Sequence, residues 1–195
     1  MTQAPLQLSY ALEQLYLDQD PDYIIDAIPQ LLCWLDPQGE KSSHQFELRE
    51  QKREGPVFHD LVLSWDDQQL AERDPRFAND LKRFRAKATL SVEQNTQYAA
   101  YGLAMVVISC FLKRRVKNIN FYRAPDLLLD TTTPSAVRGV EVAGRSKNGY
   151  AAFSQVLEGP EGKRTQLKAH VNLAEGYVSL WCSTPLVAHW EQVKP

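Results

Sequence analysis

The stretch from Pro125 to Gly144 reads PDLLLDTTTPSAVRGVEVAG, and it decides the fold that we predict. Both of its ends are apolar and rich in Leu or Val, as strands are, and the turn-like sequence TTTPSAVR separates them. We therefore predict that residues 125–130 and 139–144 pair as a hairpin. Asp126 opens the first strand and Glu141 lies in the middle of the second, so the pairing would bring both carboxylates to one place.

A carboxylate within an apolar strand is costly to bury without a partner. Either the sheet face at Glu141 is solvated, or Glu141 is paired with a cation or a metal ion. Two neighbouring carboxylates also repel unless positive charge lies between them. Mg²⁺ is the usual solution, since it takes oxygen ligands and retains several waters. On the second interpretation, Asp126 and Glu141 form a divalent-metal site.

The residues on either side of this hairpin predict an α/β order. Upstream, residues 81–112 predict a long helix, continuous or broken near Thr89, and residues 116–122 predict a strand. Downstream, residues 163–173 predict a helix and 176–182 a strand, while 148–156 fit either state. We expect one α/β unit to extend over this half of the chain.

The first third of the chain adds helices and a second hairpin. Residues 6–17 and 22–35 carry apolar positions at helical spacing, and Asp20-Pro21 predicts a capped start for the second helix. Residues 44–49 and 57–65 alternate about Gly55-Pro56, which predicts a β-hairpin. We place a soft boundary that divides an N-terminal part, 1–80, from a core, 81–195, although the two could be continuous.

Composition places the chain among soluble cytoplasmic proteins. It has 195 residues, 44% of them hydrophobic, and a formal net charge of −2, so a nucleic-acid partner would require a local basic patch. Three scattered cysteines in apolar surroundings indicate thiols in a reducing compartment. The uncharged run 94–112 begins with polar residues and predicts a buried helix, with no membrane partner. The cations at 113–115 and 117 suit either a solvated helix end or phosphate contact.

The order of these features resembles the PD-(D/E)XK nuclease superfamily. The resemblance covers about residues 88–185: a helix with the internal acid Glu93, a strand beginning Pro125-Asp126, a turn, and a strand that reads Glu141-Val142-Ala143. It implies a restriction-endonuclease-like core, a mixed central sheet flanked by helices. It also implies that Asp126 and Glu141 hold Mg²⁺ or Mn²⁺, with Glu93 assisting the metal or its water.

The chain departs from the family at the lysine. The family places a catalytic Lys two residues after the Glu, where it orients the attacking hydroxide and stabilises charge, and this chain has Ala143 there. Without a cation at this point, hydrolysis would fall sharply. Lys147, just beyond the strand, and Lys163 or Lys168, from the following helix, are candidate replacements. The alternative is a site that has lost its activity.

Two functions follow from the resemblance. The first is a Mg²⁺-dependent nuclease, a hydrolase that acts on DNA. The second is a catalytically inactive protein of the same fold that binds a protein or nucleic-acid partner, in a defence or immunity role. A fold without any nuclease-like core is a third alternative. The sequence predicts no oligomeric state.

Overall fold

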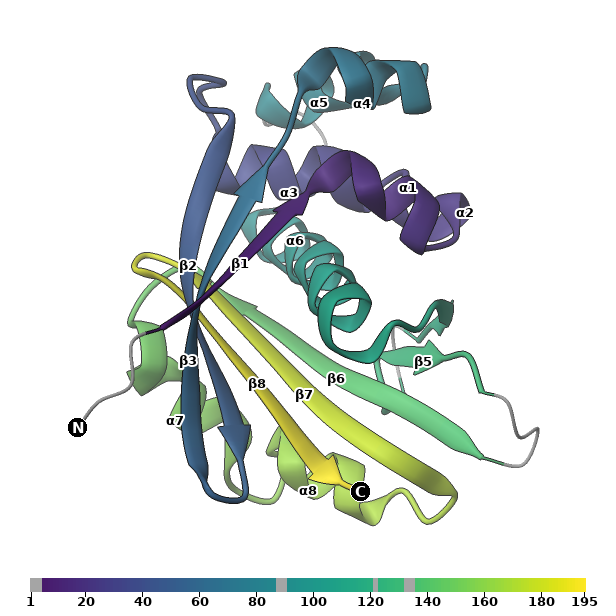
Figure 1. Cartoon of the computed structure of the whole chain (residues 1–195), viewed down its shortest axis with the longest axis vertical. Coiled ribbons are helices and arrows are strands. Elements are labelled where there is room, and N and C mark those ends of the chain that lie inside the picture. Colours follow the sequence, from purple (N-terminus) through teal and green to yellow (C-terminus); the bar gives the residue numbers. More distant parts are fainter. Residues whose placement is uncertain (1–4, 87–90, 121–122, 132–135) are drawn as a thin grey trace.

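The protein, seen here in a computed structural model that describes residues 5–86, 91–120, 123–131 and 136–195, is built on one mixed sheet. The eight strands in the described part run in the order β1-β3-β2-β8-β7-β6-β5-β4 (Figure 1). The predicted α/β class is confirmed. The strands are β1 Leu6–Ala11, β2 Ser43–Lys52, β3 Gly55–Ser64, β4 Val116–Ile119, β5 Leu127–Leu129, β6 Val137–Arg145, β7 Leu173–Ser183 and β8 Leu186–Lys194.

The N-terminal hairpin is confirmed, and the helix predicted for residues 6–17 is wrong in its first half. β2 and β3 pair antiparallel from Ser43↔Ser64 to Lys52↔Gly55. Leu6–Ala11 instead forms strand β1, parallel to β3. Its apolar residues at positions 6, 8 and 10 alternate, which is the period of a strand, and the edge of β3 completes the backbone hydrogen bonds. Helical structure begins only at the 3₁₀ turn Leu12–Gln14 and continues in α1, Leu15–Asp18.

The capped second helix is confirmed at its start and divided in its middle. The Asp20 carboxylate accepts a hydrogen bond from the Asp22 N–H at 3.1 Å, and Pro21 is the first helical residue. The helix then divides into α2, Pro21–Ile24, and α3, Ala27–Leu35. Pro29 explains the division, because proline has no N–H for the carbonyl of residue 25 and its ring crowds that carbonyl.

The predicted helix 81–112 appears as two helices. These are α5, Phe77–Arg85, preceded by α4, Asp67–Arg73, and α6, Val92–Val107, which ends in a π-helical turn, Ile108–Leu112. The predicted break near Thr89 lies outside the described residues. Ser91 begins α6 with a reciprocal capping box to Gln94. The segment Val92–Leu112 is long and apolar enough to cross a membrane, but about two thirds of its most apolar window is buried inside the protein.

Helices cover both faces of the sheet (Figure 1). α6 packs between the sheet and α3, and its buried side chains join the larger of two apolar clusters. On the opposite face lie α7, Gly149–Leu157, and α8, Lys163–Ala169, over a second cluster that includes Phe153, Leu167 and Val178. The segment 148–156 is therefore helical. The predicted helix 163–173 is shorter than expected, because β7 already begins at Leu173.

The predicted strand 116–122 appears as β4, Val116–Ile119, and its last two predicted residues, 121–122, lie outside the described part of the chain. Residues 132–135 of the predicted turn also lie outside the described part. β8 is a strand that the sequence analysis did not predict. It pairs with β7 on one side and, in parallel, with β2 on the other, from Glu47↔Val187 to Gln51↔Glu191. The division at residue 80 stays a prediction, and strands from both sides of it belong to one sheet.

Candidate functional site

The predicted hairpin of Asp126 and Glu141 is present as β5 and β6. These strands pair antiparallel through Leu127↔Val140 and Leu128↔Gly139, and Asp126 and Glu141 each lie one residue beyond the first pair. The Asp126 Oδ2 atom accepts a hydrogen bond from the Val142 N–H at 2.7 Å. The backbone of β6 therefore holds the Asp126 carboxylate beside Glu141.

Lys163 joins the two carboxylates. It is the first residue of α8, and its Nζ atom lies 3.0 Å from Asp126 Oδ2 and also donates a hydrogen bond to Glu141 Oε2. Ala143 lies on the same face of β6 as Glu141, two residues later, where a lysine was expected from the resemblance. An ammonium group from a different element, α8, therefore lies beside the two carboxylates.

Glu141 is the most deeply buried member of this ion cluster. The Glu141 side chain is 1% exposed, and its Oε1 atom has no hydrogen-bond partner in the described part of the chain. Desolvation and the nearby negative charge of Asp126 raise the pKa of Glu141 to about 7, although Lys163 opposes the shift. Burial lowers the pKa of the Lys163 ammonium, but the two carboxylates outweigh this effect and hold the pKa above its ordinary value. A second cation beside Glu141 would stabilise its charged form and so offset the cost of its desolvation.

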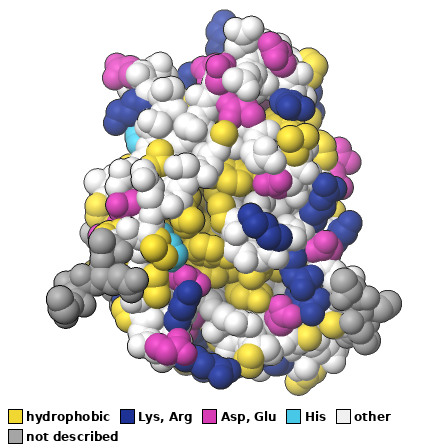
Figure 2. Space-filling view, viewed as in Figure 1, with side chains coloured by type: hydrophobic (Ala, Val, Ile, Leu, Met, Phe, Trp, Pro, Cys, Tyr) yellow, Lys and Arg dark blue, Asp and Glu magenta, His cyan; other side chains and the backbone are white. Residues whose placement is uncertain are grey.

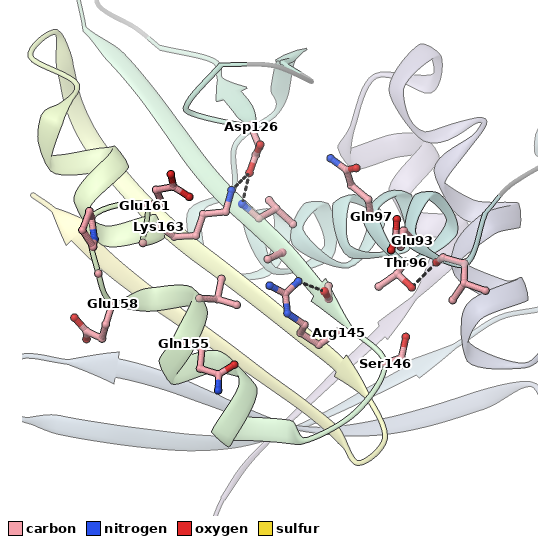
Figure 3. A pocket seen from close by; sticks show the side chains of 18 residues that line it. Glu93, Thr96, Gln97, Asp126, Arg145, Ser146, Gln155, Glu158, Glu161 and Lys163 are labelled. Carbon is pink, nitrogen blue, oxygen red and sulfur yellow. Dashed lines mark hydrogen bonds and ion pairs between the residues drawn. The ribbon is translucent and has the colours of Figure 1, made fainter.

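A cavity of about 870 Å³ opens over the cluster. The first turns of α6 form one wall, β6 beyond Val142 forms its floor, and the end of α7 with the loop before α8 forms the other wall (Figure 3). Its polar and charged lining residues are Glu93, Thr96, Gln97, Asp126, Arg145, Ser146, Gln155, Glu158, Glu161 and Lys163. The arrangement offers a solvent-open chamber with two carboxylates and an ammonium at one end.

The structure brings four of the five predicted site residues to this place. Asp126, Lys163 and Glu93 line the cavity, and Glu141 lies buried against Lys163. Glu93 is exposed on α6, across the cavity from Asp126 (Figure 3). Lys147 is exposed in the bend after β6 and is not among the residues that line the cavity. Lys168 is exposed on α8 and is likewise not among the residues that line the cavity, so Lys163 is the best placed of the three candidate lysines.

Two lining residues, Gln97 and Glu161, did not stand out in the sequence as site residues, and Arg145 was a less favoured candidate for the missing lysine because it follows Gly144 into the turn. Arg145 ends β6, four residues after Glu141, so the two lie on one strand face. Gln97 lies one helical turn after Glu93, and Glu161 lies two residues before Lys163. The signal for each was its spacing from a predicted site residue, but spacing indicates a shared face only once the element type is known.

The carboxylate oxygens of the cluster are ligands of the kind that a divalent cation takes. The described part of the chain contains no group of three or more His, Cys, Asp or Glu side chains gathered as metal ligands. Mg²⁺, however, is commonly held by one or two carboxylates with waters and substrate oxygens completing its shell. The unpartnered Oε1 of Glu141 is an acceptor of the required kind beside a second carboxylate.

The function of this site has to be argued from its own geometry and chemistry. No protein-family model, no curated protein and no solved structure matches this chain.

Proposed function

We propose that this chain is a divalent-metal-dependent phosphodiesterase of nuclease type, with Asp126, Glu141 and Lys163 at its centre. One observation carries the proposal: two carboxylates from paired strands and one ammonium from α8 meet at the end of an open cavity. Carboxylates with a neighbouring cation, arranged around a solvent-filled chamber, suit hydrolysis of an anionic ester. The resemblance to the PD-(D/E)XK superfamily supports the same reaction and suggests DNA as the substrate.

Asp126 and Glu141 would hold the Mg²⁺ or Mn²⁺ ion. The ion supplies Lewis acidity and lowers the pKa of a bound water. The Val142 N–H fixes the orientation of Asp126, and Lys163 fixes both carboxylates. In the reaction, a water oxygen forms a bond to phosphorus, the bond to the leaving oxygen breaks, and the leaving oxygen takes up a proton.

Lys163 would also stabilise the charge that develops during the reaction. Its Nζ atom lies beside both carboxylates, where the negative charge that develops on the phosphoryl oxygens would meet it. It would replace the lysine that is absent at Ala143. Glu93, exposed across the cavity on α6, is the proposed acceptor of the proton that the attacking water loses.

Cleavage of plasmid and oligonucleotide DNA with Mg²⁺ or Mn²⁺ tests the proposal. We expect Asp126→Ala and Glu141→Ala to remove cleavage, and Lys163→Met to lower kcat by roughly 10²-fold to 10³-fold, as the loss of one charge-stabilising group does. Glu72→Ala, at an exposed position on α4, is the matched control and should cleave as the wild type does. Cleavage that survives Glu141→Ala would contradict the assignment.

A second candidate is an inactive protein of this fold that binds a protein or nucleic-acid partner. It is favoured by one observation, since the Lys163 ammonium is hydrogen-bonded to both carboxylates and offsets half of their charge. On this alternative the cluster is a structural ion pair. Calorimetric titration with Mn²⁺ separates the two, because binding that disappears in Asp126→Ala supports the phosphodiesterase and the absence of binding supports the inactive protein.

A further inference from the structure

The charges that line the cavity limit what it can hold. Among its described lining residues only Lys163 and Arg145 are cationic, and Glu93, Asp126, Glu158 and Glu161 are acidic. Each phosphate that a protein neutralises on a nucleic acid needs about one Lys or Arg. Lys163 lies at the proposed reacting centre, hydrogen-bonded to Asp126 and Glu141, so Arg145 is the one described lining cation left for a second phosphate.

Arg145 is available for a phosphate. Its side chain is exposed, and the one hydrogen bond that the structure gives its guanidinium goes from Nη1 to the carbonyl of Gly144, the preceding residue, at 2.8 Å. It forms no ion pair with a carboxylate in the described part of the chain. A guanidinium has five N–H donors and binds phosphate through two of them at once. Arg145 can therefore give up its hydrogen bond to the Gly144 carbonyl and bind a phosphate instead.

The position of Arg145 suits a phosphate next to the reacting one. A strand rises about 3.3 Å per residue, so Arg145 begins about 13 Å along β6 from Glu141. Both residues lie on the same face of the strand, and Figure 3 shows Arg145 and Lys163 at separate points along the cavity. Lys163 would thus serve the reacting phosphate and Arg145 its neighbour.

Acidic residues on the rim oppose a longer backbone. Glu93 and Glu161 are exposed on opposite walls, and neither forms an ion pair in the described part of the chain, whereas Glu158 is paired with Arg164. Further phosphates passing these carboxylates would meet like charge. On the face shown in Figure 2, positive and negative side chains are interspersed, so that face has no continuous basic track. The cavity volume is that of a site for a small molecule.

We propose that the cavity selects short phosphodiesters of about dinucleotide length, with Arg145 binding the single phosphate next to the reacting one and Glu161 disfavouring longer strands. This inference rests on the proposed function and narrows its substrate from long DNA to short phosphodiesters such as the products of DNA breakdown. Arg145 and Glu161 act as specificity-determining residues in it.

Four substrates of increasing charge test the inference in the full chain with Mn²⁺. They are bis(p-nitrophenyl) phosphate, a thymidine dinucleotide with a 5′ phosphate, a single strand of about 40 nucleotides and a duplex of similar length. We expect kcat/KM to be highest for the dinucleotide. Its logarithm should fall against the logarithm of salt concentration with a slope of about −1 to −2, as for one or two phosphate contacts. A preference for the duplex, or a slope of about −4 or steeper, overturns the inference.

Two variants separate the roles of Arg145 and Glu161. Arg145→Gln should raise KM for the dinucleotide roughly tenfold with little effect on kcat, and should leave bis(p-nitrophenyl) phosphate, which has one phosphate, nearly unaffected. Arg83→Gln, which removes an exposed cation on α5, is the matched control. Glu161→Gln should raise the kcat/KM ratio of the 40-nucleotide strand to the dinucleotide several-fold. Equal losses on all substrates in Arg145→Gln, or an unchanged ratio in Glu161→Gln, contradict the proposal.

Binding distinguishes the failure of this inference from the failure of the proposed function. With Ca²⁺ in place of Mn²⁺, calorimetry should show tighter binding of the dinucleotide than of the 40-nucleotide strand, per site. If no substrate is hydrolysed but this order of affinities is found and depends on Arg145, the phosphodiesterase is wrong and the selection of short ligands stands. If neither hydrolysis nor dinucleotide binding is found, both are wrong.

Discussion

At the residue scale, the Lys163 ammonium determines whether two acids can coexist where the start of β5 meets the middle of β6. Glu141 is almost fully buried and Asp126 is largely so, and Lys163 is the cation hydrogen-bonded to both. Removing one partner of such a group leaves charge buried without compensation, which is more costly than the net contribution of the intact pair. The site is therefore sensitive to the loss of Lys163 well before any substrate binds.

Lys163→Met should lower the free energy of unfolding by on the order of 2 kcal/mol at pH 8, because both carboxylates lose their counter-ion. Urea denaturation in the presence of a chelator measures the effect. Lys168→Met, at an exposed position on the same helix, is the control and should change stability by less than about 0.5 kcal/mol. A loss no larger than that of the control would show that Lys163 does not stabilise the two carboxylates in solution.

Glu141 predicts a pH dependence of stability. Its pKa is raised from 4.5 to about 7, so the folded state favours the protonated carboxyl. The stability associated with this proton is fully present below pH 4.5 and is lost as pH rises through 7. In metal-free buffer, Glu141→Gln should therefore gain stability relative to the wild type as pH increases from about 4.5 to 8. A difference between the two proteins that stays constant over this range would contradict the raised pKa.

At the element scale, the contact between α6 and β6 sets the width of the cavity. A Cβ atom added at Gly144 would lie 2.6 Å from both the Thr96 Cγ2 atom and the Thr96 carbonyl oxygen. The absence of a side chain at Gly144 therefore lets α6, which carries Glu93 and Gln97, lie close to the strand that carries Glu141. The same packing places the apolar half of α6 against the sheet.

Gly144→Ala should lower the free energy of unfolding by about 1–3 kcal/mol and reduce activity, because the added methyl group pushes α6 away from β6. Gly102→Ala is the matched control within α6. Its added Cβ would lie 3.5 Å from the nearest atom, Leu31 Cδ2, and alanine favours a helix over glycine by up to about 1 kcal/mol. Thermal unfolding of both variants tests the pair, and equal effects would show that the contact with Thr96 is not limiting.

At the scale of the whole molecule, one sheet connects the two ends of the chain. β2 pairs in parallel with β8 over five residue pairs, and α3 packs against α6 over the same sheet. Residues 81–195 would leave the edge of β8 and the α3-facing side of α6 without partners. Exposed strand edges and apolar faces of this kind destabilise a fragment and promote its aggregation.

We therefore expect the full chain to unfold in one cooperative transition, with the same midpoint by tryptophan fluorescence and by far-ultraviolet circular dichroism. A fragment of residues 81–195 should be unfolded or aggregated at the same temperature. Two separate transitions, or a fragment that folds and unfolds cooperatively alone, would establish the boundary near residue 80 that the sequence suggests.

Local patterns were enough to predict the acidic half of the site. Asp126 and Glu141 lie 15 residues apart in two apolar stretches of the sequence, so their pairing could be predicted from neighbouring residues alone. Asp20 and Pro21 were likewise sufficient to predict the start of α2. The helix predicted at residues 6–17 was wrong over residues 6–11, because the apolar residues there fit both the period of a helix and that of a strand. The strand forms because it pairs with the edge of β3, about 50 residues away in the sequence.

The amino-acid sequence by itself determined the α/β class, the two hairpins and the carboxylate pair, since each depends on propensities and contacts within a few residues. Only the tertiary structure decided that Lys163 rather than Lys147 meets the acids, that Arg145 and Glu161 line the cavity, and that β8 joins β2. These outcomes depend on contacts between residues far apart in the chain. Their free energy comes from burial and from charges brought together by packing, which no local pattern encodes.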